Sequence, residues 1–181
     1  MPFDDALPYT KPAATTRVIC VALDESKFAE TAFNWSVNHL CRNSSESNGV
    51  LDEIVLLHVR APPPKLIIPS GNDMFAEAII YSNEDYFNWM NEQSRIASHN
   101  MLKKFAYRLM EQNKGVVVRC IALVGDPRTE LVEAAKSLNA EMMVVGTRGM
   151  GLIQKAMIGS VSDHLLHHLE CPVIVVRAEQ V

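Results

Sequence analysis

The sequence predicts an α/β protein built around a parallel sheet with helices on both of its faces. Five short, almost continuously apolar runs alternate with four segments of helical periodicity along the 181 residues. Apolar runs of this length are typical of strands buried on both sides, and parallel pairing requires helical crossovers between strands. The length fits one domain with a single core, and no shift in composition marks a second domain.

The predicted elements alternate regularly from residue 17 onward. The strands are expected over 17–23, 53–60, 116–124, 141–145 and 172–177. The helices are expected between Ser26 and Asn43, from about Glu84 to Asn113, from Pro127 to about Leu138 and from Ser160 to Leu169. The third helix has the clearest start, because Asp126 is a good N-cap and Pro127 suits the first helical position. In the second helix, one face can be apolar and buried through Ile96, Met101, Leu102, Phe105 and Leu109.

Two stretches carry no predicted helix or strand. Residues 1–16 are rich in proline and lack periodicity, which indicates a loose N-terminal arm. The stretch 61–82 contains four prolines and a Ser70-Gly71-Asn72-Asp73 turn signal, which favours a long loop. We therefore expect a flexible arm over 1–16, followed by one domain over 17–181 that carries this loop.

Charge and composition exclude several function classes. The formal net charge is −4, whereas proteins that bind nucleic acid or anionic membranes carry clustered Lys and Arg. The apolar runs are too short for a transmembrane helix, and the N-terminus lacks the features of a signal peptide. We therefore expect a cytoplasmic protein with neither nucleic acid nor membrane as its partner. The four cysteines form no CxxC pair, which argues against a cysteine zinc site.

A glycine-rich loop over 146–160 is the segment that indicates chemistry. It joins a predicted buried strand to a helix, so backbone N–H groups and a helix N-terminus meet at the carboxyl end of the sheet. Such a place favours phosphate, and Ser160 could act both as N-cap and as a hydroxyl donor. The loop has no Gly-Lys pair, as a Walker loop requires, and Gln154 stands where a dinucleotide fingerprint needs its third glycine. The alternative is that these glycines only build turns.

The spacing of this loop resembles a known nucleotide-binding signature. Gly146-x2-Gly149-x9-Gly159-Ser160 is similar to the G-2x-G-9x-G-[S/T] motif of the ATP-binding universal stress proteins. Other segments resemble the same family: Val21–Ser26, Leu57–Val59, Gly125–Pro127 and Cys171–Val176. The resemblance covers about residues 17–178.

This resemblance implies a Rossmann-like open sheet of five parallel strands in the order 3-2-1-4-5. Ligands of such sheets bind at the point where the strand order reverses, beyond the carboxyl ends of the strands. By similarity, the ligand would be ATP, AMP or ADP, with Mg a candidate metal at Asp24. The nucleotide-binding residues implied are Ala22, Leu23, Asp24, Val59, Gly146, Arg148, Gly149, Gly159, Ser160 and Val161. Among them Ala22 and Val59 would line the adenine, whereas Arg148 would either neutralise phosphate or remain solvated.

The family resemblance implies a nucleotide-dependent regulatory module in stress response, with at most slow ATP hydrolysis. One alternative is an adenylating or ATP-hydrolysing enzyme on the same fold, although Asp24-Glu25-Ser26-Lys27 lacks the Ser-Gly-Gly-x-Asp-Ser loop of such enzymes. Another is an interaction module that binds no nucleotide. The last strand would be a sheet edge, and the resemblance implies a homodimer that pairs Val173–Arg177 with its copy. Further protein partners cannot be named from the sequence.

Two other clusters could carry function. His164 and His168 have the i, i+4 spacing of metal ligands, but no acidic pair or cysteine nearby completes a site, which favours a surface or interface role. Tyr86, Phe87 and Trp89 could stack on bases. Without a basic patch, we expect these three aromatic residues to anchor the core or a loop.

Overall fold

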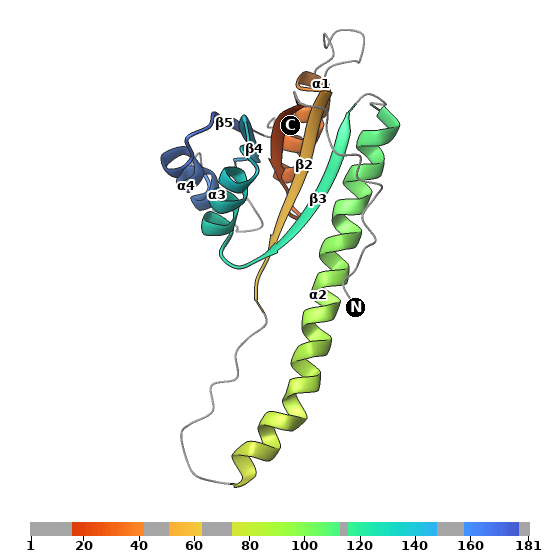
Figure 1. The fold of residues 1–181 in the computed structure, drawn as a ribbon, viewed down its shortest axis with the longest axis vertical. Coiled ribbons are helices and arrows are strands. Elements are labelled where there is room, and N and C mark those ends of the chain that lie inside the picture. Colours follow the sequence, from red (N-terminus) through yellow and green to blue (C-terminus); the bar gives the residue numbers. More distant parts are fainter. Residues whose placement is uncertain (1–15, 42–50, 63–73, 113–115, 148–157, 178–181) are drawn as a thin grey trace.

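The computed structural model describes residues 16–41, 51–62, 74–112, 116–147 and 158–177. Within these ranges strands and helices alternate as the sequence predicts (Figure 1). The strands are β1 (Thr16–Ala22), β2 (Leu51–Arg60), β3 (Val117–Val124), β4 (Met142–Gly146) and β5 (Val173–Val176). The helices are α1 (Lys27–His39), α2 (Met74–Gln112), α3 (Pro127–Ser137) and α4 (Ser160–His168).

The strands form one parallel sheet in the order β3-β2-β1-β4-β5, which confirms the predicted fold class and strand order. In the register of the central strand, Val21 lies opposite Leu56 of β2 and opposite Val144 of β4. The order reverses between β1 and β4, so their carboxyl ends form the switch point of the sheet.

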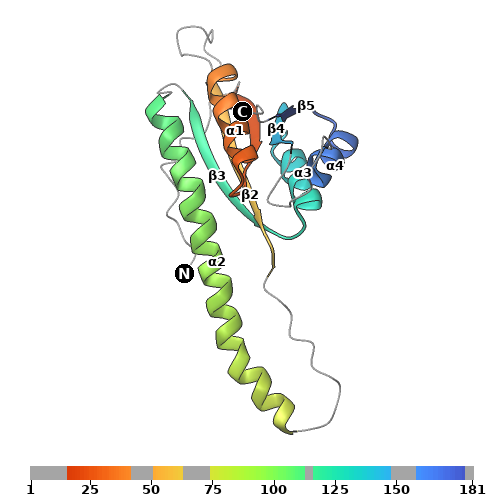
Figure 2. The ribbon, with the colours of Figure 1, turned by 180° about the vertical axis from the view of Figure 1, so that it is seen from behind.

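Each face of the sheet is covered by its own pair of helices. Alternate residues of β1 point to opposite faces, so Val21 and Cys20 enter different clusters. Helices α1 and α2 cover the face of Val21, which Figure 2 shows from their side, and Phe33 and Leu102 are fully buried there. Helices α3 and α4 cover the face of Cys20, where Leu165 is fully buried.

Side-chain capping explains where two of the helices begin. The Ser26 hydroxyl accepts a hydrogen bond from the backbone N–H of Ala29 at 3.2 Å, so Ser26 is the N-cap of α1. Asp126 accepts from the N–H of Arg128 at 2.8 Å and Pro127 follows it, which confirms the predicted start of α3. The predicted start of α4 at Ser160 is confirmed, but Gly159 is its N-cap, so the expectation that Ser160 caps this helix was wrong.

Helix α2 is longer than the sequence pattern indicates. It begins at Met74, so the prediction of a loop to residue 82 and a helix from Glu84 was wrong for 74–83. The turn signal at 70–73 was assigned to the middle of a loop, yet it directly precedes residues with good helix propensity, such as Met74 and Ala76. Figure 1 shows that the N-terminal part of α2 projects beyond the carboxyl ends of β2 and β3.

Among the residues of α2 whose side chains the structure describes, those in the core lie in its C-terminal part. Leu102, Phe105 and Leu109 pack in the cluster on its face of the sheet, as predicted. Ile96 was expected on the same buried face, but it is exposed. Tyr86 and Trp89 are more than half exposed, so the expectation that they anchor the core or a loop was wrong.

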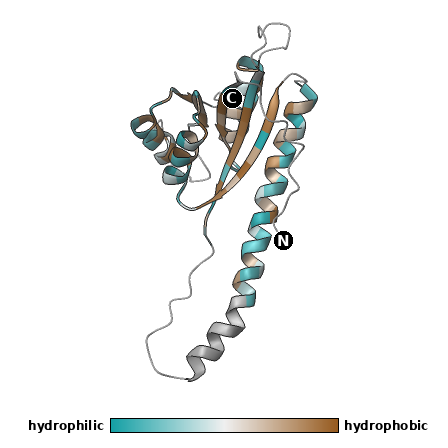
Figure 3. Cartoon of the chain, viewed as in Figure 1, coloured by the Kyte–Doolittle hydropathy of each residue, from teal (hydrophilic) through white to brown (hydrophobic). Residues whose placement is uncertain are grey.

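The hydropathy of the residues differs between the sheet and α2. Figure 3 shows apolar residues concentrated along the strands, whereas the coloured part of α2 carries a mixture of polar and apolar residues. Within the described residues, none of the helices is both long and apolar enough to span a membrane.

Candidate functional site

The carboxyl end of β1 is tied to β2 by two hydrogen bonds. The backbone N–H of Leu23 donates to the carbonyl of Leu57 at 2.8 Å. The Nδ1 of His58 lies 2.9 Å from the carbonyl oxygen of Leu23. Because a carbonyl can only accept, this second contact requires the proton on Nδ1. His58 was not among the predicted site residues, although it lies in the Leu57–Val59 segment that indicated the family.

Asp24 follows immediately and shapes the turn into α1. Its Oδ1 accepts a hydrogen bond from the backbone N–H of Ser26 at 2.9 Å, and the residue is partly buried. Asp24 therefore stabilises the turn that leads into α1, and Ser26 in this turn is the N-cap of that helix. Asp24 does not itself cap α1, and its hydrogen bond in the turn is compatible with a ligand contact.

Asp24 also lines a pocket of about 200 Å³ between the start of α1 and the middle of α2. The other described residues around this pocket are Glu25, Ser26, Glu30, Met101, Lys104, Phe105 and Arg108. None of the predicted phosphate-binding residues that the structure describes is among them. Asp24 thus lies between this pocket and the switch point of the sheet.

The carboxyl end of β4 approaches α1 closely. A β-carbon on Gly146 would lie 2.7 Å from the carbonyl oxygen of Phe28 and 2.8 Å from its carbonyl carbon. Real β-carbons do not come this near to backbone atoms, so packing alone requires glycine at this position. The first glycine of the signature therefore has a structural reason that the sequence pattern did not reveal.

The two ends of the loop after β4 are joined at its base. The N–H of Thr147 donates to the carbonyl of Val176 at 3.0 Å, and the N–H of Gly159 donates to the carbonyl of Thr147 at 2.6 Å. The buried Ser162 hydroxyl donates to the carbonyl of Gly159 at 2.9 Å. Sequence reasoning missed the roles of Thr147 and Ser162. The predicted site residues Arg148 and Gly149 lie outside the described residues.

Helix α4 begins at the base of the loop after β4, where the hydrogen bond between Gly159 and Thr147 joins the two ends of the loop. Gly159 has φ −67° and ψ 153°, an extended conformation, and no side chain caps the helix. The first amides of a helix have no partner within it, so the N–H groups of Ser160 and Val161 suit an anion. Ser160 is exposed, and its position places a hydroxyl beside these amides.

Three of the predicted apolar site residues lie on one face of the sheet. Ala22, Val59 and Val161 all belong to or pack against the cluster under α3 and α4. Leu23 lies in the opposite cluster, beneath α1 and α2. The structure therefore places Ala22, Val59 and Val161, which we call the apolar wall, on one face of the sheet and Leu23 on the other.

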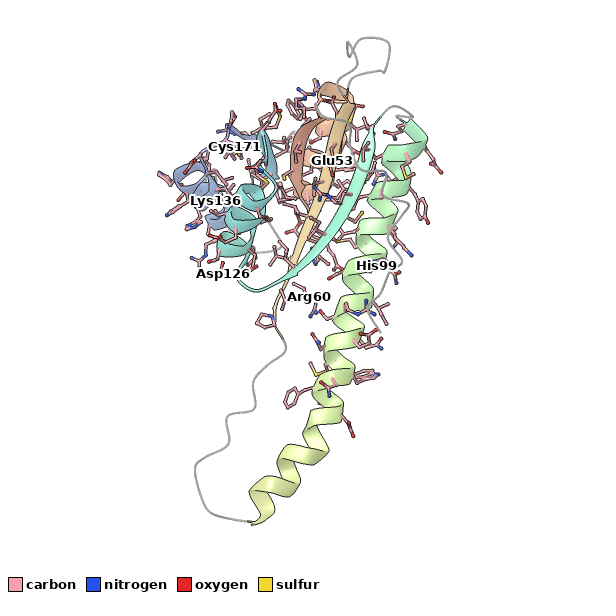
Figure 4. All side chains as sticks on the ribbon, viewed as in Figure 1. Glu53, Arg60, His99, Asp126, Lys136 and Cys171 are labelled. Atoms are coloured by element: carbon pink, nitrogen blue, oxygen red, sulfur yellow. The ribbon has the colours of Figure 1, made fainter. Side chains whose placement is uncertain are left out.

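Arg60 and Asp126, which were not among the predicted site residues, lie near the carboxyl edge of the sheet, where β2 ends and α3 begins (Figure 4). The guanidinium of Arg60 donates to Oδ1 of Asn91 at 2.7 Å, which ties the end of β2 to α2. Asp126 accepts from the guanidinium of Arg128 at 2.6 Å, and this hydrogen bond lowers the pKa of the Asp126 carboxyl to about 2. Both arginines are thus engaged by side chains of the protein.

The histidine pair of α4 does not form a metal site with its neighbours. The His164 and His168 rings stack with centroids 3.7 Å apart, and the Nδ1 of His168 contacts the carbonyl of His164 at 2.8 Å. Among the described residues, no group of three His, Cys, Asp or Glu side chains is placed to hold a metal.

The fold resembles solved structures of one family. Universal stress protein UspA from Lactobacillus plantarum superposes with a TM-score of 0.68 at 16% identity, covering 91% of this chain and 100% of that one. A universal stress protein family protein from Arabidopsis thaliana with AMP bound superposes with a TM-score of 0.56 at 23% identity, covering 90% and 92%.

Sequence comparison points to the same family. The curated "Universal stress protein A-like protein" of Arabidopsis thaliana is 28% identical over 148 residues, which are 81% of this chain and 76% of that protein. The model of the universal stress protein family matches residues 15–177, a range that includes all of the residues that the structure describes. With this match and the β3-β2-β1-β4-β5 sheet, the chain belongs to the universal stress protein family.

Proposed function

We propose that this chain binds an adenine nucleotide, with ATP, AMP and ADP as candidates, at the switch point between β1 and β4. The observation that carries the proposal is the hydrogen bond between Gly159 and Thr147, which sets the amino end of α4 directly beside the end of β4. A helix start held there offers free amides and a positive dipole to phosphate. The relative with AMP bound, from Arabidopsis thaliana, supports the choice of ligand.

The described residues fit the parts of such a ligand. The apolar wall of Ala22, Val59 and Val161 offers a surface for the adenine ring. The amides at the start of α4 and the Ser160 hydroxyl would hold phosphate and ribose oxygens. Asp24, at the end of β1, would contact a ribose hydroxyl or a Mg²⁺ ion carried by the phosphates.

The conformation of Gly159 supports a ligand-related reason for this glycine. Its φ of −67° is open to any residue, so the backbone does not require glycine there. Gly146 differs, because its missing side chain makes room for Phe28. We infer that a side chain at position 159 would enter the space of the phosphates.

We propose that the bound nucleotide serves regulation in stress response, with at most slow hydrolysis. A homodimer through β5 forms part of this proposal. β5 is an edge strand with an apolar sequence, and pairing it with its own copy would satisfy its outer N–H and C=O groups. A Val175→Lys variant should dissociate this dimer, as measured by light scattering at tens of micromolar protein.

The test of nucleotide binding compares Gly159→Leu and Ser160→Ala with the unmodified protein by calorimetric titration of ATP and adenosine. Gly159→Leu should weaken ATP at least tenfold, which is about 1.4 kcal/mol. Ser160→Ala should cost less, about 1 kcal/mol, because it removes one neutral hydrogen bond. Both losses should be smaller for adenosine, which has no phosphate.

A Thr129→Leu variant serves as the matched control. Thr129 is exposed in the first turn of α3, so the change adds leucine at the start of a different helix. It should leave ATP affinity unchanged, and circular dichroism should show all variants folded. Equal ATP affinity in Gly159→Leu and the unmodified protein would refute the phosphate site.

A further inference from the structure

Helix α2 carries a second apolar stripe, on the side away from the sheet. Its large exposed apolar residues are Tyr86, Trp89, Ile96, Tyr107 and Met110, and they fall on positions whose spacing alternates between three and four, the heptad spacing of helices that pair. Together with the polar residues at the same spacing, they form what we call the α2 seam: Tyr86, Trp89, Gln93, Ile96, Asn100, Lys103, Tyr107 and Met110.

The members of the α2 seam are exposed except Lys103, which is partly buried. The exposed fractions are 58% for Trp89, 54% for Tyr86 and 53% for Tyr107, and 43% for Met110 at its far end. With 3.6 residues per turn, the seam lies opposite the buried face that includes Leu102. From Tyr86 to Met110 it runs for about 36 Å at 1.5 Å per residue. Large aromatic groups in a continuous exposed stripe are typical of an interaction surface.

The charge of α2 changes sign along its length. From Met74 to Ser94 the helix has four acidic residues and no Lys or Arg: Glu77, Glu84, Asp85 and Glu92. From Arg95 to Met110 it has four basic residues and no Asp or Glu: Arg95, Lys103, Lys104 and Arg108. Two such helices side by side would repel each other when parallel and attract each other when antiparallel.

We propose that the α2 seam docks against the α2 seam of a second copy of this chain, with the two helices antiparallel. A two-fold axis level with Ser98 sets Tyr86 against Met110 of the second copy, and Trp89 against Tyr107 of the second copy. Each contact is then made twice, as a two-fold interface requires. This arrangement also places the projecting acidic half of each helix along the basic half of the other.

The polar members of the seam fit the same register. Near the axis Asn100 faces Ile96 of the second copy, and Gln93 faces Lys103 of the second copy. On one flank Glu92 meets Lys103 of the second copy. Within its own chain Glu92 already accepts from Arg95 at 2.8 Å, and its side chain remains 47% exposed. The Glu92–Lys103 pair forms only in the antiparallel arrangement.

This interface is separate from the pairing proposed for β5. The seam lies on the outer side of α2, which packs with β2 and β3, and β5 is the strand at the other edge of the sheet. A measurement of molecular mass alone would not distinguish dimers formed through the seam from dimers formed through β5. Cross-linking between two different positions of the seam does distinguish them.

Full-length Gln93→Cys and Lys103→Cys variants are mixed and oxidised, and the products are separated without reductant. In the proposed register positions 93 and 103 of two copies face each other, whereas two copies of one position lie about 15 Å apart. The mixture should therefore form a disulfide-linked dimer, and each variant alone should form little, since disulfides need Cα atoms within about 7 Å. Adding Trp89→Ala to both chains should lower the yield at least fivefold.

An Asn88→Ala change in both chains is the matched control, because Asn88 is exposed beside Trp89 but lies off the seam. It should leave the cross-linking yield unchanged, and circular dichroism should show every variant folded. Sedimentation should then show weaker association for Glu92→Lys and for Lys103→Glu, about tenfold each, and recovery within threefold in the double variant. Cross-linking of either variant with itself, no cross-linking in the mixture, or no recovery in the double variant would overturn the proposal.

Discussion

Gly146 and the backbone of Phe28 are in direct contact where β4 ends against the first turn of α1. A β-carbon at position 146 would lie 2.7 Å from the Phe28 carbonyl oxygen, and backbone atoms cannot move aside as a flexible side chain can. The glycine lets the two elements approach, which holds the start of α1 over the switch point of the sheet. One signature glycine is thus set by packing, whereas Gly159 has an ordinary backbone conformation.

Gly146→Ala should therefore destabilise the fold itself. The added methyl group has no room, and overpacking of this kind typically costs about 1–3 kcal/mol. Urea denaturation followed by circular dichroism should show a lower midpoint. Gly159→Ala is the matched control and should shift the midpoint little, because φ −67° suits alanine. Equal shifts in the two variants would contradict the contact with Phe28.

The buried ion pair between Arg17 and Asp52 should contribute strongly to stability. The two join the first residues of β1 and β2 through bonds of 2.8 and 2.9 Å, and only 2% of the Asp52 side chain is exposed. Arg17→Met would leave a buried carboxylate without this partner and should cost about 3 kcal/mol or more. Urea denaturation would measure the loss.

A pair at the surface provides the comparison. Arg128 and Asp126 are similarly close, but about half of each side chain is exposed. Arg128→Met should therefore change the free energy of unfolding far less than Arg17→Met does. If the two losses are alike, burial does not determine the strength of the Arg17–Asp52 pair.

The same surface pair predicts a pH dependence. The Arg128 hydrogen bond lowers the pKa of Asp126 in the folded protein from an ordinary 3.8 to about 2. A lowered folded pKa stabilises the protein above the unfolded value, and this contribution disappears as the pH falls from about 4 to 2. An Asp126→Asn variant keeps a capping side chain but loses the charge. Its stability deficit, measured by urea denaturation, should be present at pH 7 and vanish near pH 2, whereas a deficit that is constant with pH would contradict this assignment.

The features that were predicted correctly from the sequence are those that depend on residues close together along the chain. The strand runs, the helical crossovers and the Asp126-Pro127 start of α3 are local patterns, and the structure has them all. The start of α2 was missed because residues 74–83 follow a turn signal and a proline-rich stretch, although several of them favour helix.

The contacts that were missed join residues far apart in the chain. His58 meets the carbonyl of Leu23 across 35 positions, and Gly146 meets Phe28 across still more. The spacing of the glycine signature identified the region of the site, but nothing in it distinguishes a glycine needed for packing from one needed for a ligand. The exposed aromatic residues of α2 were expected to anchor the core or a loop, because sequence alone does not reveal that the helix extends beyond the sheet.

The last prediction concerns catalysis by the proposed nucleotide site. Fast phosphoryl transfer needs a cation that stabilises the phosphates and a residue that orients the attacking group. Near this edge of the sheet, Arg60 donates to Asn91 and Arg128 donates to Asp126. Asp24 already accepts a hydrogen bond from Ser26, which suits a positioning role better than proton transfer.

ATP turnover should therefore be far below the rates of about 1–100 per second that are typical of kinases. Release of phosphate from purified protein, with ATP in excess, measures the rate. Asp24→Ala should weaken nucleotide binding if the carboxylate contacts ribose or Mg²⁺, while any residual hydrolysis stays slow. The Thr129→Leu control should change neither quantity. A rate above one per second that Asp24→Ala abolishes would favour an ATP-hydrolysing enzyme and contradict the regulatory proposal, because a catalytic carboxylate would then be acting at the end of β1.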